Sequence, residues 1–207
     1  MVLKLYGVSY ASGGTGLVAM VLAEKQVPFE LIPIDIDNGE QKRPDHVAKN
    51  PFGQVPVIDD DGFVLYEGRA ICRYLAEKYT DQGTPLIPSN LRDKALFEQA
   101  ASVEYSSSFP QVAKVAMENV IKKDQGLPVD EAVLGEELAK LSTVLDIYEI
   151  ILGKQRFVAG NEFTLADLFH LCFVPSGIRQ GGPDFMARRG PNVTRWWTEI
   201  TSRPTWG

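Results

Sequence analysis

The sequence predicts two parts of different fold class, an α/β layer over residues 1–80 and an all-helical part over residues 91–207. Short strand patterns alternate with helical patterns in the first part, and no strand pattern follows it. The segment DQGTPLIPSN at 81–90 is rich in proline and glycine, which is typical of a linker. We therefore expect two domains joined at this segment.

The first part shows strand and helix patterns in the order β-α-β-α-β-β-α. Strands are expected at 3–6, 29–35, 55–58 and 63–66, and the clearest helices at 17–25 and 68–79. The turn residues DDDG between the last two strands indicate a hairpin. A mixed sheet with helices on its faces, in this order, is a thioredoxin-like layer.

The second part shows helical patterns only. Long helices are expected at 91–122 and 130–154, and shorter ones begin in NEFTLADLFHLCF (161–173) and NVTRWWTEITSRP (192–204). Apolar residues recur in the second long helix at alternating spacings of four and three and form a core-facing seam: Leu134, Leu138, Leu141, Leu145, Tyr148 and Leu152. Thr164 and Asp167 have the spacing of a helix-capping box, a structural role.

Composition and charge argue against several classes of function. The 207 residues are 44% hydrophobic and 23% charged, which is ordinary for a soluble globular protein. A net charge of −6 argues against a nucleic-acid partner, and the lack of a long apolar run argues against a membrane span. The two cysteines, Cys72 and Cys172, are far apart, and neither His46 nor His170 has a ligand cluster beside it, so we expect no metal. The start of the chain has no apolar signal region, and we expect a cytoplasmic protein.

The stretch NPFGQVPVIDDDGFVLYEGRAICRYL at 50–75 carries the most information about function. A cis bond between Val55 and Pro56, at the start of a strand, would leave the N–H and C=O of Val55 unpaired and free to bind an extended peptide. Glu67 and Gly68 open the next helix, whose unpaired N–H groups suit a carboxylate, while the Glu67 carboxylate can meet an ammonium group. A peptide-like ligand with an α-amino acid head would satisfy both sites.

These motifs, with GTPLIP, FTLADL and the tryptophan-rich last helix, resemble the glutathione S-transferases, most closely the phi-like class of plants and fungi. The resemblance covers essentially the whole chain. It implies the cytosolic glutathione S-transferase fold, with glutathione as co-substrate or cofactor and without a metal. It also implies a homodimer in which the small domain packs on the helical domain of its partner.

The resemblance assigns the glutathione-binding residues position by position. Gln54 and Val55 are expected to hold the cysteinyl-glycine backbone, with Pro56 as the cis proline. Glu67 is expected to meet the γ-glutamyl amino group, and the Gly68 N–H its carboxylate. The family usually has serine at position 68, and the missing hydroxyl should weaken this contact.

The resemblance also points to the stretch GEQK. Gln41 stands where phi-like members often have histidine, and Lys42 is a candidate partner for the glycine carboxylate of glutathione. A lysine that is simply solvated is the alternative.

The loop YGVSYASGGTG at 6–16 contains the candidates for the catalytic hydroxyl. In phi-like enzymes a serine at the start of the first helix donates a hydrogen bond to the glutathione sulfur and so stabilises the thiolate. Counting back from the following helix gives Ser12, whereas counting forward from the first strand gives Ala11, because the loop has one extra residue. Ser12 is the first candidate, Ser9 and Tyr10 are the next, and activation by backbone N–H groups alone is the remaining possibility.

A long helix is expected, by resemblance, to line the pocket for the electrophile. Tyr105, Phe109, Val112 and Ala116 recur there at 4-3-4 spacing, and Val8 precedes the first helix. Core packing is the alternative for each of the four helical residues. A proline at position 110 is expected to kink this helix.

Three functions remain open at the level of sequence. The first is a glutathione S-transferase whose thiolate attacks a hydrophobic electrophile, as in detoxification. The second is a glutathione-dependent cis-trans isomerase of a conjugated alkene in secondary metabolism, suggested by the extra loop residue, the glycines of the loop and Gly68. The third is a non-catalytic binding module of the same fold.

Overall fold

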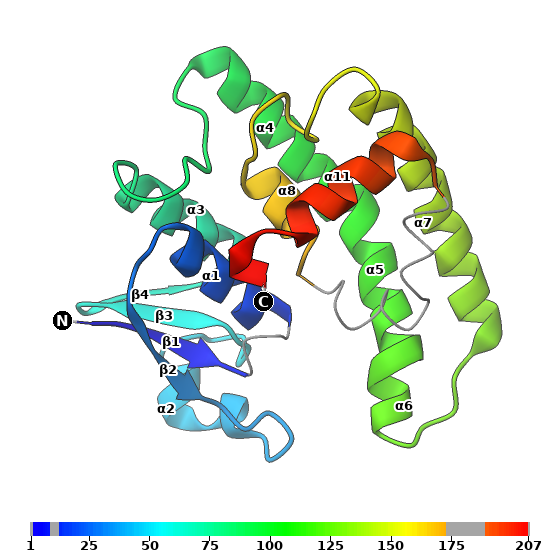
Figure 1. Cartoon of the computed structure of the whole chain (residues 1–207). Helices are drawn as coiled ribbons and strands as arrows, with labels where there is room; N and C mark the ends of the chain where they lie inside the picture. Colours follow the sequence, from blue (N-terminus) through cyan, green and yellow to red (C-terminus); the bar gives the residue numbers. More distant parts are fainter. Residues whose placement is uncertain (1, 9–12, 173–188, 207) are drawn as a thin grey trace. The chain divides into compact units, whose positions relative to one another are not determined.

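A four-stranded sheet organises the first of the two units into which the chain divides, Met1–Ile87 and Pro88–Gly207. Figure 1 shows this computed structural model, which describes residues 2–8, 13–172 and 189–206. The division between the units falls within the segment 81–90 that the sequence predicts as a linker.

The sheet has the order β2-β1-β3-β4 and is mixed (Figure 1). Its strands are β1 (Leu3–Gly7), β2 (Phe29–Pro33), β3 (Val57–Asp60) and β4 (Phe63–Tyr66). β1 runs parallel to β2 and antiparallel to β3, and β3 and β4 form the predicted hairpin. The predicted strand positions are therefore confirmed to within a few residues at their ends.

Helices cover the sheet. They are α1 (Gly13–Glu24), the short α2 (Pro44–Val47) and α3 (Gly68–Lys78), with a 3₁₀ turn, η1, at Glu40–Lys42. α1 and α3 pack against each other on one face of the sheet, and α2 lies on the other side (Figure 1). Their buried apolar residues form the core of the unit with alternate residues of β1 and the first two residues of β3: Leu3, Leu5, Leu17, Val18, Val21, Leu22, Val57, Ile58, Ile71, Cys72 and Leu75.

The first helix starts four residues earlier than its apolar pattern predicts. The apolar pattern begins at Leu17, whereas α1 begins at Gly13. The pattern misses the first turn because three glycines of low helix propensity occupy it. Thr15, 1% exposed, fixes this turn by accepting a hydrogen bond from the Val8 N–H at 3.2 Å. A Cβ on Gly7 would lie only 2.3 Å from the Thr15 hydroxyl, so a glycine is required there.

The end of α1 is tied to the start of the predicted linker. The Thr84 N–H donates to the Glu24 carbonyl at 2.9 Å, and the Gln82 amide donates to the Lys25 carbonyl at 2.7 Å. Gly83 has a φ of +62°, and a Cβ there would lie 2.2 Å from the Glu24 carbonyl. Residues 82–84 therefore belong to the first unit.

The second unit begins with a long helical run that contains two wider π-helical turns. It comprises α4 (Leu91–Val103), η2 (Glu104–Ser108), α5 (Phe109–Ala116), η3 (Met117–Ile121) and α6 (Lys122–Asp124). Proline at position 110 has no N–H to continue the α-helical ladder, and at η2 the N–H of the residue before it bonds a carbonyl five residues back. The sequence predicts a kink here, and the structure accommodates the proline by widening the turn.

Three further helices complete the described part of this unit: α7 (Glu131–Leu152), α8 (Leu165–Phe169) and α11 (Pro191–Thr201), followed by the 3₁₀ turn η4 (Pro204–Trp206). The predicted seam of α7 is confirmed over its last four members, which are buried: Leu141, Leu145, Tyr148 and Leu152. Its first two members, Leu134 and Leu138, are half-buried.

The predicted capping box at the start of α8 is also confirmed. The Thr164 hydroxyl accepts from the Ala166 N–H, and the Asp167 carboxylate accepts from the Thr164 N–H. The same carboxylate accepts from the Val158 N–H at 3.0 Å and the Trp196 indole at 2.9 Å. Burial raises the pKa of Asp167 to about 6, although these donors act in the opposite direction.

No helix in residues 2–8, 13–172 and 189–206 is long and apolar enough to cross a membrane. Over the same ranges no group of three potential ligands could hold a metal ion, and both cysteines are buried and form no disulfide.

Candidate functional site

Three backbone segments meet at one point in the first unit: the start of α1, the Val55–Pro56 turn and the start of α3. Their contact can be measured at two glycines. A Cβ on Gly14 would lie 2.8 Å from Pro56 Cδ, and a Cβ on Gly68 would lie 3.7 Å from Pro56 Cγ and 3.8 Å from Gly14 Cα. Two helix N-termini therefore converge on one proline.

This convergence favours anions. The first N–H groups of a helix have no partner inside the helix, and the helix dipole places partial positive charge there. Both effects act at the starts of α1 and α3, on either side of Pro56. A thiolate and a carboxylate are the anionic groups of a peptide ligand that could use them.

Glu67, the residue before α3, has an unusual backbone conformation. Its φ is +73° and its ψ is 103°, a region that side-chain-bearing residues seldom occupy, and its side chain is exposed. Strain of this kind is retained mainly where structure or function requires it. Glu67 directly precedes α3, and its carboxylate accepts no hydrogen bond from the start of that helix. Its role toward an amino acid head stays a prediction.

Val55 has the backbone geometry that the sequence predicts. Its bond to Pro56 is cis, the single cis bond in the described ranges, and β3 begins only at Val57. Within the part of the chain that the structure describes, neither the N–H nor the C=O of Val55 forms a hydrogen bond. Both groups are available to an extended ligand.

The turn before Val55 is held from inside the protein. The Gln54 carbonyl accepts a hydrogen bond from His46 Nε2 and another from the Asn50 amide, each at 2.9 Å. Asn50 also accepts from the Phe52 N–H at 3.1 Å, which closes a turn over NPF. The sequence pattern predicts no role for Asn50, and for His46 it raises only metal binding, for which no ligand cluster is present in the sequence.

A signal for Asn50 was present, because asparagine two residues before a turn N–H is typical of an Asx turn. No local signal identifies His46, whose partner lies eight residues further along the chain.

Lys42 is placed beside the same turn. Its ammonium donates to the Phe52 carbonyl at 3.0 Å and lies against Gly53, where a Cβ would approach Lys42 Cδ to 2.8 Å. An ammonium group has three donors, so two remain for a ligand carboxylate. Gln41 differs, because its amide N–H donates to the Ile36 carbonyl at 3.1 Å and its buried Oε1 has no partner among the described residues.

The loop with the candidate hydroxyls is described only at its two ends. Ser9, Tyr10 and Ser12 lie outside the described residues, so each stays a prediction. Val8, expected near the electrophile, is partly exposed. The Thr15 hydroxyl accepts a hydrogen bond from the Val8 N–H, which gives Thr15 a structural role.

The predicted electrophile residues of the second unit differ in exposure. Tyr105 is 59% exposed and stacks on Phe109, with ring centroids 6.0 Å apart. Val112 and Ala116 are buried in the core of the unit. These four residues remain candidates for the electrophile pocket.

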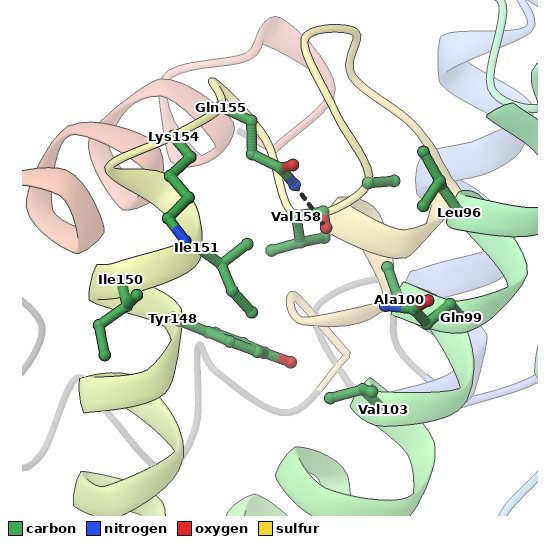
Figure 2. A pocket seen from close by; sticks show the side chains of 11 residues that line it. Leu96, Gln99, Ala100, Val103, Tyr148, Ile150, Ile151, Lys154, Gln155 and Val158 are labelled. Atoms are coloured by element: carbon green, nitrogen blue, oxygen red, sulfur yellow. Dashed lines mark hydrogen bonds between the residues drawn. The ribbon is translucent and has the colours of Figure 1, made fainter.

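The second unit has an open, largely apolar pocket of about 230 Å³ between α4 and α7, with Gln99, Lys154 and Gln155 as its polar lining (Figure 2). Leu96, Ala100 and Val103 line it from α4, and Tyr148 and Ile151 line it from α7. Burial raises the pKa of the Tyr148 hydroxyl, and the nearby Glu104 and Asp167 carboxylates act in the same direction. No residue proposed for glutathione or electrophile binding lines this pocket.

Comparisons with known proteins match both units of the chain. The model of the glutathione S-transferase N-terminal domain matches residues 1–77, and that of the C-terminal domain matches residues 96–204. The chain is 39% identical over 206 residues to glutathione S-transferase F9 of Arabidopsis thaliana, covering 100% of this chain and 95% of that one.

Solved structures are similar over the same extent. Glutathione transferase F7 from Populus trichocarpa is 37% identical, with a TM-score of 0.94 over 99% of this chain and 96% of that chain. Glutathione S-transferase I from maize, in complex with an atrazine glutathione conjugate, is 31% identical, with a TM-score of 0.90 over 99% of this chain and 94% of that chain.

Proposed function

Because the chain belongs to the glutathione S-transferase family, and to its phi class, we propose that it activates the glutathione thiolate for attack on a hydrophobic electrophilic carbon. The observation that carries this proposal is the convergence of two helix N-termini on Pro56, beside the unpaired backbone of Val55. The maize relative, which was crystallised with a glutathione conjugate, supports the same reaction.

Each end of glutathione has a proposed partner in the first unit. Val55 binds the cysteinyl backbone as an added strand would, and Lys42 binds the glycine carboxylate. Glu67 meets the γ-glutamyl ammonium, and the Gly68 N–H binds its carboxylate. Gln41 can bind the glycine end of glutathione only if its amide N–H gives up its hydrogen bond to the Ile36 carbonyl.

The thiol then lies near the start of α1. A free thiol has a pKa of about 8.5, so most of it is protonated at neutral pH, and each unit of lowering is equivalent to about 1.4 kcal/mol. The α1 N-terminus and a hydroxyl donor from the loop lower the pKa of the sulfur, and the thiolate attacks the electrophile.

The test is a thiolate titration of bound glutathione by ultraviolet absorbance. Ser12→Ala is expected to raise the pKa of the bound thiol and to lower turnover of a chromogenic electrophile. Ser9→Ala and Tyr10→Phe are the matched controls. An unchanged titration in Ser12→Ala, with a shift in one of the controls, would transfer the donor role to that residue.

A glutathione-dependent isomerase is a second candidate. The thiolate adds to an alkene carbon conjugated with a carbonyl, the resulting single bond rotates, and elimination returns glutathione with the alkene geometry changed. Gly68 favours this candidate, since it departs from the usual serine of the class. The loop glycines favour it less, because a Cβ at Gly14 would collide with Pro56 and Gly13 has a φ of +48°. We rank conjugation first.

One experiment separates the two activities. A cis-polyene carbonyl compound is incubated with the enzyme and glutathione, while NMR follows the alkene couplings and a thiol reagent follows free glutathione. Isomerised product without thiol loss would establish the isomerase, and stoichiometric thiol loss with a stable adduct would establish conjugation. Retention on a glutathione column without turnover of a broad electrophile panel would instead indicate a binding module.

We also propose a cytoplasmic homodimer. Phe52 is 65% exposed, and the pocket between α4 and α7 is largely apolar, is large enough for a phenyl ring and is flanked by the exposed Leu96 and Ile150. A two-fold interface would place Phe52 of each copy in this pocket of the other. Gel filtration of Phe52→Ala at micromolar concentration should show monomers, with Leu127→Ala, which changes another exposed apolar residue, as the control. Elution of the unmodified protein as a monomer would contradict the proposal.

A further inference from the structure

We infer that His46 is a positioning residue of the glutathione site, which fixes the peptide unit that presents the Val55 N–H to the ligand. The inference rests on the proposed function. It concerns a side chain that need not touch glutathione and acts through the backbone of Gln54.

The Gln54 carbonyl accepts two hydrogen bonds from side chains inside the protein. His46 and Asn50 are 3% and 2% exposed, and both donate to the Gln54 carbonyl at 2.9 Å. A carbonyl oxygen has two lone pairs, so two buried donors saturate it. The direction of this carbonyl is therefore fixed by two side chains on one side of it.

The planarity of the peptide transmits this constraint to Val55. The bond between Gln54 and Val55 is trans, so its C=O and the following N–H are coplanar and point in opposite directions. With the carbonyl held toward His46 and Asn50, the Val55 N–H must point away from them. That N–H forms no hydrogen bond with any residue in the described ranges, as expected of a donor kept for a ligand.

The hydrogen bonds also determine where the ring proton lies. A carbonyl can only accept, so His46 Nε2 must carry a hydrogen. His46 Nδ1 is buried and has no partner among the described residues, so it has nothing to donate to. The structure thus assigns the Nε2–H tautomer to His46.

The second histidine of the chain provides an internal comparison. His170 Nδ1 lies 2.8 Å from the Ala166 carbonyl and therefore donates, and His170 Nε2 lies 3.0 Å from the Tyr148 hydroxyl. The carbonyl partner thus places a hydrogen on Nδ1 of His170, whereas in His46 it places one on Nε2.

The first experiment locates the ring hydrogen of His46 and does not depend on any change in activity. Long-range proton–nitrogen correlation spectra of the ¹⁵N-labelled full chain should show a hydrogen on Nε2 of His46, and the pattern lost in His46→Gln identifies His46. A His46 ring that carries its hydrogen on Nδ1 alone would overturn the inference.

The second experiment is calorimetric titration with glutathione. His46→Leu removes the donor and should weaken glutathione binding about tenfold, which corresponds to one hydrogen bond, while kcat at saturating glutathione changes less than about twofold. In His46→Gln the amide nitrogen stands where Nε2 stood, so affinity should return to within about threefold of the original. His170→Asn is the control, because it changes the other buried histidine and should leave glutathione affinity unaltered.

The outcomes separate the two levels of the argument. If the unmodified protein binds no glutathione, the proposed function is wrong and this inference fails with it. If it binds and a folded His46→Leu binds equally well, only the positioning role is wrong. Should His46→Leu not fold, His46→Gln decides, and a large loss of affinity in folded His46→Gln would overturn the role.

Discussion

Restoring a hydroxyl at position 68 should tighten glutathione binding. The start of α3 offers its first N–H groups to a carboxylate but has no side-chain donor, since Gly68 occupies the position where the family usually has serine. A Cβ there would meet Pro56 Cγ at 3.7 Å, Gly14 Cα at 3.8 Å and the Gly14 carbonyl at 3.9 Å, all of which are ordinary contacts. Gly68→Ser therefore fits without displacing its neighbours.

The size of the gain follows from the bond that is added. A hydrogen bond to a charged group contributes about 1.5–3 kcal/mol, and Gly68 is only partly buried, so we take the lower end. That value corresponds to about a tenfold lower Kd for glutathione. Replacing glycine in a helix also restricts the unfolded chain and adds up to about 1 kcal/mol of stability. Gly68→Ala shares this second effect but has no hydroxyl.

Calorimetric titration of the original protein, Gly68→Ala and Gly68→Ser with glutathione measures the difference. We expect the serine variant alone to gain affinity, while both variants gain stability. The tripeptide 4-aminobutyryl-Cys-Gly lacks the α-carboxylate of glutathione and should not discriminate between the three proteins. If serine and alanine bind glutathione equally, or if the serine variant also gains affinity for this analogue, our placement of the carboxylate at Gly68 is wrong.

Three further predictions concern other parts of the molecule. Lys42→Met should raise KM for glutathione about tenfold with little change in kcat, because its ammonium is expected to bind a ground-state carboxylate; steady-state kinetics with an unchanged KM would contradict this. Gly7→Ala should lower the free energy of unfolding in urea by about 1–3 kcal/mol, since its Cβ would lie 2.3 Å from the Thr15 hydroxyl, and adding Thr15→Ala should cost less than the sum of the single changes. Asp167 has a pKa raised from 3.8 to about 6, so as pH falls the folded state binds a proton at this residue at a higher pH than the unfolded state does. Its contribution to stability is therefore present below pH 4 and is lost as pH rises through 6. The stability of the original protein minus that of Asp167→Asn should thus fall by about 2.4 kcal/mol from pH 4 to pH 7, and a difference independent of pH would refute the raised pKa.

The elements that could be predicted from sequence are those whose apolar pattern is continuous. β1, β3 and the seam of α7 fall into this class, because most side chains of each pattern are buried in a core. The start of α1 does not, since glycines of low helix propensity occupy it and the turn is held by packing of Gly14 against Pro56 and of Thr15 against Gly7. The π-helical turn before α5 depends on how a chain accommodates proline, which residue type alone does not determine.

The residues of the candidate site also fall into two groups, those that could be predicted from sequence and those that could not. Val55–Pro56 and Glu67–Gly68 could be predicted because each is a local motif with a local consequence, a cis turn or a helix start. His46 could not, because its effect depends on a carbonyl eight residues away that only the folded turn brings within reach. The local pattern around it gives no indication of that partner.

A site made largely of backbone explains why this chain departs from its family at several side chains. The groups that would hold glutathione are the N–H and C=O of Val55 and the first N–H groups of α1 and α3, which any sequence provides if the backbone is correctly placed. Loss of one hydroxyl, as at Gly68, then weakens a contact without removing the site. Residues that place the backbone are less replaceable, because moving one segment would misalign donors along the whole ligand. Changes at Gly14, where a Cβ would lie 2.8 Å from Pro56 Cδ, should therefore reduce glutathione affinity more than the loss of any single side-chain contact.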